Sequence, residues 1–341
     1  MLDLKIAVDA FGGDNAPLAI IKGAVQAANT MPDDEVILVG DKQKIEDILA
    51  NETVLHGNIS IRHASEVIAT GDVPVEAIRT KKDSSLMVTI GMLKNKEADA
   101  TVSAGNTGAY LAGAFRTLGR IKGVKRPALA TLLPTVGDNP GIILDIGANA
   151  DCRPEQLVQF AQMGAVYAAH VLHIENPQVA LLNIGAEEAK GNALTKETYQ
   201  LLKEKSLNFI GNIEPRDVLS GQANVIVCDG FTGNVVIKLI EGTAGTLFSM
   251  LKKVFYRNIC SKLAAGILKP GLKTIKAKMD YSEYGGVPFL GLDGVLFKAH
   301  GSSDAITIQN AVYAAKEYIA AGINDQIKEL MATANADENE R

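Results

Sequence analysis

Short apolar runs alternate with amphipathic helical patterns along almost the whole chain, and this alternation limits the fold more than any other feature. The run Ile6-Ala7-Val8 is continuously apolar, which is typical of a strand that helices cover on both faces. Regular alternation of such runs with helices predicts β-α-β units and a mostly parallel sheet. We therefore predict a three-layer α/β/α fold.

The elements are placed by the periodicity of apolar residues, with Gly, Pro and capping residues marking their ends. The predicted strands are 4–9, 35–39, 59–63, 99–103, 128–133, 142–146, 179–184, 208–211, 224–228 and 295–299. The predicted helices are 17–29, 41–50, 84–95, 107–118, 154–173, 196–205, 233–262 and 303–321. Residues 1–332 are expected to form a single unit of two interlocked lobes, followed by a frayed polar tail at 333–341.

Composition argues against several classes of protein. The chain is 47% hydrophobic but only 5% aromatic, and it has no Trp, so a base-stacking surface for nucleic acid is not expected. A net charge of -5 also argues against general nucleic-acid binding. The N-terminus lacks the pattern of a signal peptide, and no apolar run is long enough to cross a bilayer. We therefore expect a cytoplasmic protein.

The three cysteines, Cys152, Cys228 and Cys260, have no C-x-x-C spacing, so neither a zinc site nor a disulfide framework is expected. A nucleophilic thiolate would need an activating base or a helix N-terminus. No activating partner is visible for Cys152 or Cys228, and we interpret both as small buried hydrophobic residues.

The first strand runs into a glycine-rich loop. Asp9 comes at the end of the strand, Gly12 and Gly13 permit a close approach of a ligand, and Pro17 suits the first turn of a helix. The N–H groups at the start of that helix favour an anion. The loop matches neither the dinucleotide fingerprint G-x-G-x-x-G nor a Walker lysine motif. It therefore predicts a phosphate or carboxylate ligand before a nucleotide.

Four further strand-to-helix junctions combine glycine with small polar residues: Ser103–Gly108, Asp145–Asp151, Asn183–Gly191 and Asp229–Asn234. Ala299–Asp304 is another candidate of the same kind. Parallel strands end at the same edge of an open sheet, which is where such folds bind ligands. We therefore expect these junctions to lie along one edge and to form a site rich in backbone donors.

Three side chains are candidates for the chemistry. Lys190 either neutralises a phosphate or is an exposed helical lysine. Asn234 could donate to phosphate or to a developing oxyanion. His300 is a general acid, a phosphate anchor or a structural residue, and all three roles stay open.

A larger set is expected to hold phosphate or the rest of the substrate. Thr107 and Thr232 could instead serve as helix caps, and the aspartates are expected to orient amides because a carboxylate repels a phosphate. The members are Asp9, Gly12, Gly13, Asp14, Asn15, Gly105, Asn106, Thr107, Asp229, Thr232, Gly233 and Ser302. No metal ligand is among them.

The segment 242–279 is basic and contains no Asp or Glu. Its apolar residues recur at helical spacing, and Pro270-Gly271 is expected to break it into two helical pieces. These apolar residues form a stripe with two possible roles. The stripe either packs on the body or on a second subunit, or it is part of a basic amphipathic surface for anionic lipid or an acidic protein partner. The expected contact residues are Leu251, Lys252, Lys253, Phe255, Arg257, Lys262, Leu263 and Lys269.

Several stretches, in this order, resemble the bacterial phosphate acyltransferases, which act on acyl-acyl carrier protein and phosphate. They are Gly12–Pro17, Ser103–Gly108, Asn183–Asn192, Asp229–Asn234, Tyr284-Gly285-Gly286 with Gly291, and Ala299–Ser303. The resemblance implies a fold like that of isocitrate and isopropylmalate dehydrogenases and of phosphate acetyltransferase, with a projecting helical pair near 247–278. It also implies a homodimer that associates peripherally with the membrane.

The same resemblance implies a reversible reaction of a long-chain acyl carrier protein thioester with inorganic phosphate, without a cofactor. The acyl phosphate product would feed phospholipid synthesis through a membrane acyltransferase. In our hypothesis the glycine loops hold phosphate, Lys190 offsets its charge, Asn234 or a loop amide stabilises the oxyanion, and His300 anchors phosphate or protonates the departing sulfur.

Three alternatives remain. A metal- and NAD-dependent decarboxylating dehydrogenase lacks support, because the sequence has no clustered aspartates for a divalent ion. A phosphate transacetylase that acts on coenzyme A thioesters would use the same chemistry. A non-catalytic membrane or carrier-protein scaffold would use the basic segment but would leave the phosphate-friendly loops unexplained. Sequence alone does not predict the preferred acyl chain length.

Overall fold

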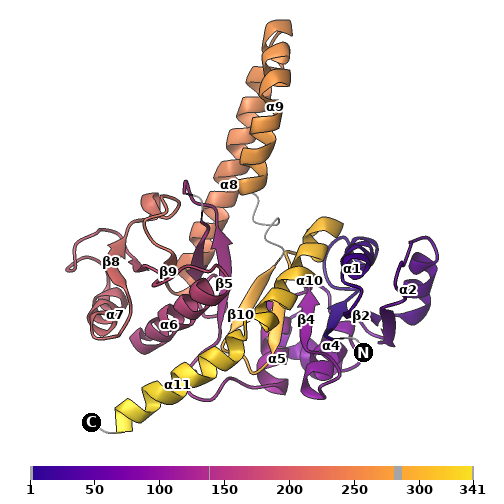
Figure 1. Cartoon of the computed structure of the whole chain (residues 1–341), viewed down its shortest axis with the longest axis horizontal. Coiled ribbons are helices and arrows are strands. Elements are labelled where there is room, and N and C mark those ends of the chain that lie inside the picture. Colours follow the sequence, from indigo (N-terminus) through magenta and orange to yellow (C-terminus); the bar gives the residue numbers. More distant parts are fainter. Residues whose placement is uncertain (1–2, 138, 280–285, 340–341) are drawn as a thin grey trace.

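The computed structural model describes residues 3–137, 139–279 and 286–339, apart from the side chains of 277 and 334–339. Its centre is an 11-stranded sheet in the order β3-β2-β1-β4-β11-β10-β5-β6-β9-β7-β8 (Figure 1). The strands are β1 (Lys5–Asp9), β2 (Glu35–Gly40), β3 (Ile59–His63), β4 (Ala100–Ser103), β5 (Ala128–Leu133), β6 (Gly141–Leu144), β7 (Val179–Leu182), β8 (Phe209–Ile213), β9 (Val225–Val227), β10 (Val287–Leu290) and β11 (Val295–Lys298).

Helices pack on both faces of the sheet, as predicted. Along β1, Ile6 and Val8 lie in the core cluster shared with α1 and α10, whereas Ala7 lies in a cluster with residues of α4. The helices are α1 (Leu18–Thr30), α2 (Lys42–Leu49), α3 (Pro74–Thr80), α4 (Ser85–Lys94), α5 (Thr107–Thr117), α6 (Pro154–His170), α7 (Ala193–Lys203), α8 (Gly230–Phe255), α9 (Ile259–Met279), α10 (Ala305–Ala320) and α11 (Ile323–Asn339).

The sheet is mostly parallel, but its two halves run in opposite directions. β11 is antiparallel to β10, β10 to β5, and β5 to β6. These three reversals leave β6, β9, β7 and β8 antiparallel to β3, β2, β1, β4 and β11. The prediction that all the glycine-rich junctions lie along one edge is therefore wrong. The strands that lead into the junctions after β1, β4 and β11 run in one direction, and those that lead into the junctions after β6, β7 and β9 run in the other.

Most predicted elements are present within a few residues of their expected ends. The prediction omitted β10, α3 and α11. β10 and α3 are too short to show a clear period, whereas α11 does carry one, with Ile323, Ile327 and Met331 on its buried face. α11 continues to Asn339, so the structure gives helix over most of the expected tail at 333–341; fraying of those turns stays a prediction. Tyr284-Gly285 lies outside the described residues.

Helices α8 and α9 form a pair that projects away from the sheet (Figure 1). We call residues 242–279 of this pair the helical arm. The single helix expected at 233–262 and the break expected at Pro270-Gly271 are both wrong, because the chain reverses between Phe255 and Ile259. The Asn258 side chain accepts a hydrogen bond from the N–H of Ser261, which caps the new helix, and Pro270 lies inside it.

Candidate active site

The loop after β1 packs against the loop after β4. A Cβ on Gly12 would lie 2.4 Å from Oδ2 of Asp9 and 2.7 Å from the backbone N of Gly105. The glycine at this position is therefore explained by the close approach of a second loop, and no ligand is needed to account for it. Asp9 is buried and accepts a hydrogen bond of 2.7 Å from the Ser103 hydroxyl. Burial raises the pKa of Asp9, and hydrogen bonds oppose that rise.

The same loop is joined to the turn after β11. The N–H of Asp14 donates to the carbonyl of Gly301 at 2.7 Å, and the Asn15 amide donates to the carbonyls of Ser302 and Ser303. Gly13, with φ +104°, makes the bend that brings these groups together. The Asn15 side chain and the backbone of Asp14 therefore join the two loops, and an orienting role of the Asp14 carboxylate stays a prediction.

Asn106 connects a helix start to a neighbouring loop. Its Oδ1 accepts from the N–H of Ala109 and caps α5, while its Nδ2 contacts the carbonyls of Ala69, Thr70 and Asp72. The amide is already occupied on both sides, so in this arrangement it has no free donor for a phosphate.

In the second half of the sheet, Asp145 organises the loop after β6. Its carboxylate is fully buried and accepts five hydrogen bonds, from the N–H groups of Leu129, Gly147, Ala148 and Asn149 and from the Asn149 side chain. Five donors around one carboxylate leave no room for the loop to rearrange while Asp145 stays in place.

The start of α8 rests on that loop. Asp229 caps the helix by accepting from the N–H and the hydroxyl of Thr232. A Cβ on Gly233 would lie 1.9 Å from the carbonyl oxygen of Asp145, so the helix touches the strand end directly. Asn234, one residue on, donates from Nδ2 to the carbonyl of Ile146 at 3.1 Å.

A cavity of about 410 Å³ lies where the two halves of the sheet meet. Its polar lining residues include Thr107, Asn234, Lys238, Glu241, Lys298 and His300, and its apolar lining residues include Leu111, Leu129, Ile146, Ala148, Ile237 and Val287. Both halves contribute because the carboxyl end of β11 pairs with β10 at Val287 and the carboxyl end of β6 pairs with β5 at Ala130, close to where β10 and β5 pair with each other. The cavity can therefore hold a molecule with an anionic end and a hydrocarbon part.

His300 is held by the turn that follows it. Its Nδ1 lies 2.8 Å from the Ser302 hydroxyl and accepts from the Ser302 N–H at 3.3 Å. Since a backbone N–H can only donate, this geometry assigns the proton of the neutral ring to Nε2. Partial burial and the nearby Lys298 lower the pKa of His300, so the neutral ring is favoured at neutral pH. Nε2–H is a hydrogen-bond donor.

Lys298 is a cavity residue that sequence reasoning missed. Its side chain is 5% exposed at the end of β11, and burial lowers its pKa to about 8 although Asp9 and Asp14 oppose the change. The signal in the sequence was a single cation inside an apolar strand, Val295 to Ala299, because lysine is rarely placed at a buried strand position. Sequence reasoning treated the residue only as part of the strand.

Three of the predicted site residues line the cavity: Thr107, Asn234 and His300. Most of the others lie in the loops around it and hold those loops together. They are Asp9, Gly12, Gly13, Asp14, Asn15, Gly105, Asn106, Asp229, Thr232, Gly233 and Ser302. Lys190 is exposed in the loop after β7 and is not among the residues that line the cavity.

The two cysteines near these loops have raised pKa values. Burial raises the pKa of Cys152 to about 12 and raises that of Cys228 well above its usual range. Cys228 is fully enclosed, and its thiol contacts the carbonyl of Asp145. The interpretation of both as small hydrophobic residues is consistent with this burial.

Comparison with known proteins identifies the family. Residues 4–326 match the family described as fatty acid synthesis protein. A phosphate acyltransferase of Bacillus licheniformis is 50% identical over 326 residues, 96% of this chain and 98% of the relative. One from Alkaliphilus oremlandii is 49% identical over 337 residues, 99% of this chain and all (100%) of the relative. The chain belongs to the phosphate acyltransferase family.

Solved structures support the fold of this phosphate acyltransferase family member. A phosphotransacetylase from Streptococcus pyogenes superposes with a TM-score of 0.61 at 16% identity, covering 92% of this chain and 94% of the other. The EutD phosphotransacetylase from Staphylococcus aureus gives a TM-score of 0.60, with the same identity and coverage, 16%, 92% and 94%. At such low identity the likeness concerns the fold alone.

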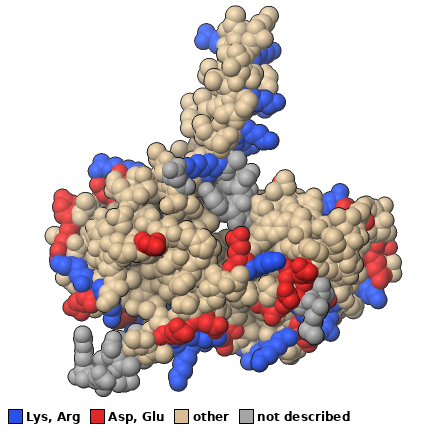
Figure 2. Space-filling view, in the orientation of Figure 1, with Lys and Arg blue, Asp and Glu red and all other residues tan. Residues whose placement is uncertain are grey.

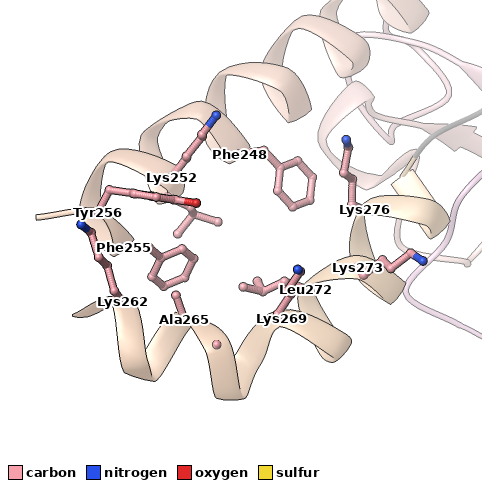
Figure 3. A pocket seen from close by; sticks show the side chains of 12 residues that line it. Phe248, Lys252, Phe255, Tyr256, Lys262, Ala265, Lys269, Leu272, Lys273 and Lys276 are labelled. Atoms are coloured by element: carbon pink, nitrogen blue, oxygen red, sulfur yellow. The ribbon is translucent and has the colours of Figure 1, made fainter. Parts of the chain in front are cut away.

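The helical arm carries a second cavity, of about 530 Å³, between its two helices. Phe248 and Phe255 lie inside it, and a rim of lysines surrounds them: Lys252, Lys262, Lys269, Lys273 and Lys276 (Figure 3). In the space-filling view the arm shows basic side chains along its length, whereas the body shows both signs (Figure 2). Leu263 is 67% exposed and Ile267 is 82% exposed, so in one chain the apolar stripe does not pack on the body.

Among the residues that the structure describes, no group of three or more His, Cys, Asp or Glu side chains could hold a metal ion. Within the same residues, no helix combines the length and the apolar character that crossing a membrane requires.

Proposed function

We propose that this protein transfers a long-chain acyl group from an acyl carrier protein thioester to inorganic phosphate, and that the acyl phosphate feeds phospholipid synthesis. Membership in the phosphate acyltransferase family supports the phosphate acceptor and the acyl donor. The observation that carries the proposal is a cavity whose lining combines Lys298, His300 and Asn234 with apolar side chains such as Leu111 and Val287. Such a mixed lining suits a phosphate that meets the carbonyl end of a fatty acyl chain.

In this proposal a phosphate oxygen attacks the thioester carbonyl, and a C–O bond forms as the carbonyl becomes an oxyanion. The C–S bond then breaks, the carbonyl re-forms, and the departing sulfur takes a proton to give the free thiol of the carrier. Phosphate is itself the nucleophile, so no serine or cysteine intermediate is needed. Holding the two reactants in place supplies much of the rate.

Two cavity side chains are suited to the charge that develops in this step. Nε2–H of His300 can donate to the oxyanion or to the departing sulfur. Asn234 lies across the cavity, with its amide directed to the loop after β6. Because the N–H groups of residues 147–149 already donate to Asp145, we propose that the Asn234 amide, which has a second N–H, supports the oxyanion. Lys190 stays a proposed phosphate contact from outside the cavity wall.

We also propose that residues 1–332 act as one catalytic unit within a homodimer that associates with anionic membranes. The exposed apolar stripe and lysine rim of the helical arm support this proposal. Leu251 and Phe255 are half-buried between the helices, whereas Lys252, Lys253, Arg257, Lys262 and Lys269 are exposed. The same basic surface suits the acidic carrier protein and the membrane acyltransferase that would use the product.

The test is release of free thiol from palmitoyl-acyl carrier protein, with and without inorganic phosphate and with no metal or nicotinamide added. We expect release that depends on phosphate and an acyl phosphate that hydroxylamine traps. The coenzyme A thioester serves as the comparison substrate, and faster turnover of it would favour the phosphate transacetylase alternative. No release from the folded protein at any phosphate concentration would overturn the proposal.

A further inference from the structure

Lys298 is buried without the partners that a buried ammonium requires. Among the described residues, its Nζ donates one hydrogen bond, to the carbonyl of Ala299, and forms no ion pair. An ammonium has three donors, so two are left uncommitted. Asp9 and Asp14 are close enough to act on Lys298 electrostatically, but Asp9 already accepts from Ser103. Burial of a charge in this state is unfavourable unless an anion completes the site.

The surroundings indicate where that anion would come from. Lys298, Ala299 and His300 line the same cavity, and α5 begins at Thr107, which also lines it. Strand alternation places Lys298 on the same face of β11 as Leu296, which packs with residues of α5. The uncommitted donors are therefore next to space that opens beside a helix N-terminus, a combination that binds anions.

We propose that Lys298 is the cation that binds the substrate phosphate in the cavity, an inference that rests on the proposed function. The other candidate lysines are placed differently. Lys238 lines the cavity but is exposed on α8, and Lys190 is exposed outside the lining. A charge in a buried site is less screened by water than one at the rim. Lys298 is therefore the residue whose removal weakens phosphate binding most.

The experiment measures the initial rate of thiol release against phosphate and, separately, against acyl carrier protein thioester. Lys298→Met keeps most of the length of the side chain and removes the charge. Lys196→Met on the exposed face of α7 is the control. For Lys298→Met we expect the KM for phosphate to rise about 10- to 100-fold, because a charge-assisted hydrogen bond is lost. The KM for the thioester should stay within about twofold of its value in the unsubstituted protein, because Lys298 contacts phosphate and not the thioester.

A second readout does not depend on turnover. Inorganic phosphate alone should raise the melting temperature of the unsubstituted protein and of Lys196→Met, but not that of Lys298→Met. If Lys298→Met does not unfold cooperatively, Lys298→Gln takes its place, since it keeps a donor and lacks the charge.

Each outcome decides one of the two ideas. If Lys298→Met still releases thiol in a phosphate-dependent way with an unchanged KM for phosphate, the role of Lys298 is overturned and the proposed function stands. If the melting temperature of that variant is lowered as well, Lys298 is a counter-charge for Asp9. Absence of phosphate-dependent release in the unsubstituted protein overturns the proposed function. In that case the anion site is still supported if phosphate raises the melting temperature of the unsubstituted protein but not that of Lys298→Met. If phosphate does not change the melting temperature of the unsubstituted protein, the anion site is overturned.

Discussion

The loops around the cavity and the helical arm use their polar and apolar residues in opposite ways. Around the cavity, the chain satisfies its own groups: Asp145 accepts five hydrogen bonds and Asn106 contacts three carbonyls. In the arm, large apolar side chains such as Ile267 lie open to solvent among lysines. The contrast teaches that the loops around the cavity are held by hydrogen bonds within the chain, whereas the arm has an exposed apolar surface suited to another body.

The largest expected effect concerns the loop on which the cavity depends. Asp145→Ala would leave five N–H donors without an acceptor in a buried setting, and we expect a loss of about 4 kcal/mol in the free energy of unfolding. Denaturant unfolding measures it. The control is Asp304→Ala, which removes only the cap of α10 and should cost about 1 kcal/mol. Equal losses in both variants would contradict the central role of Asp145.

Substitutions in the helical arm are expected to change binding and not stability. Replacement of Lys252, Lys253, Lys262 and Lys269 by Glu should leave the free energy of unfolding nearly unchanged, because these side chains are exposed. Binding to anionic vesicles should fall strongly, by about 1 kcal/mol for each lysine. Co-sedimentation with vesicles that contain phosphatidylserine measures the loss, and neutral vesicles are the control. Unchanged binding would remove the lipid surface as the partner of the arm.

The role of His300 can be divided between proton donor and anchor. His300→Ala should lower turnover about 10²- to 10³-fold, as the loss of a donor to a developing oxyanion does. His300→Gln is the matched variant, because its side-chain amide still donates a hydrogen bond but transfers no proton. Recovery in the Gln variant would identify a hydrogen-bond donor, whereas equal loss in both would identify a general acid. Thiol release at saturating phosphate is the measurement.

The phosphate dependence should change with pH through Lys298. Since burial lowers the pKa of Lys298 to about 8, the ammonium loses its proton as the pH rises through that value, and the KM for phosphate should rise about fivefold over the next pH unit. The groups that face Lys298 are Asp9, Asp14 and His300, with Lys238 and Glu241 on α8.

Lys298→Arg is the control for that pH dependence, because a guanidinium stays charged throughout this range. The pH profile of the KM for phosphate should become flat in this variant. A profile that stays steep would assign the titration to one of the facing groups.

The smallest expected effect concerns Lys190. An exposed lysine acts on a phosphate through screened charge, so Lys190→Ala should raise the KM for phosphate only about two- to fivefold. Steady-state kinetics beside Lys298→Met gives the comparison. If Lys190→Ala turns over at a near-normal rate at all phosphate concentrations, Lys190 does not contact the phosphate. A loss as large as that of Lys298→Met would break the distinction between buried and exposed cations.

Much of the candidate site could be predicted from local patterns. The glycine and small-polar junctions are where chain-reversing loops occur, and His300, Asn234 and Thr107 come from three of them and meet in one cavity. The reason for the glycines differed from the prediction. Gly12 and Gly233 are small because another part of the backbone lies against them, which no local pattern reports.

By itself, the sequence determined most element types and the basic character of the arm, because periodicity and charge pattern act over a few residues. It did not determine the helix caps, since Asn106 and Asp229 cap α5 and α8 in place of Thr107 and Thr232. Only the tertiary structure decided which junctions meet. The antiparallel strands β10 and β5 reverse the sheet between its halves, and pairing between strands far apart in the chain sets that reversal. The same pairing buries Lys298 beside Asp9, and burial is what turns an ordinary lysine into one with a lowered pKa.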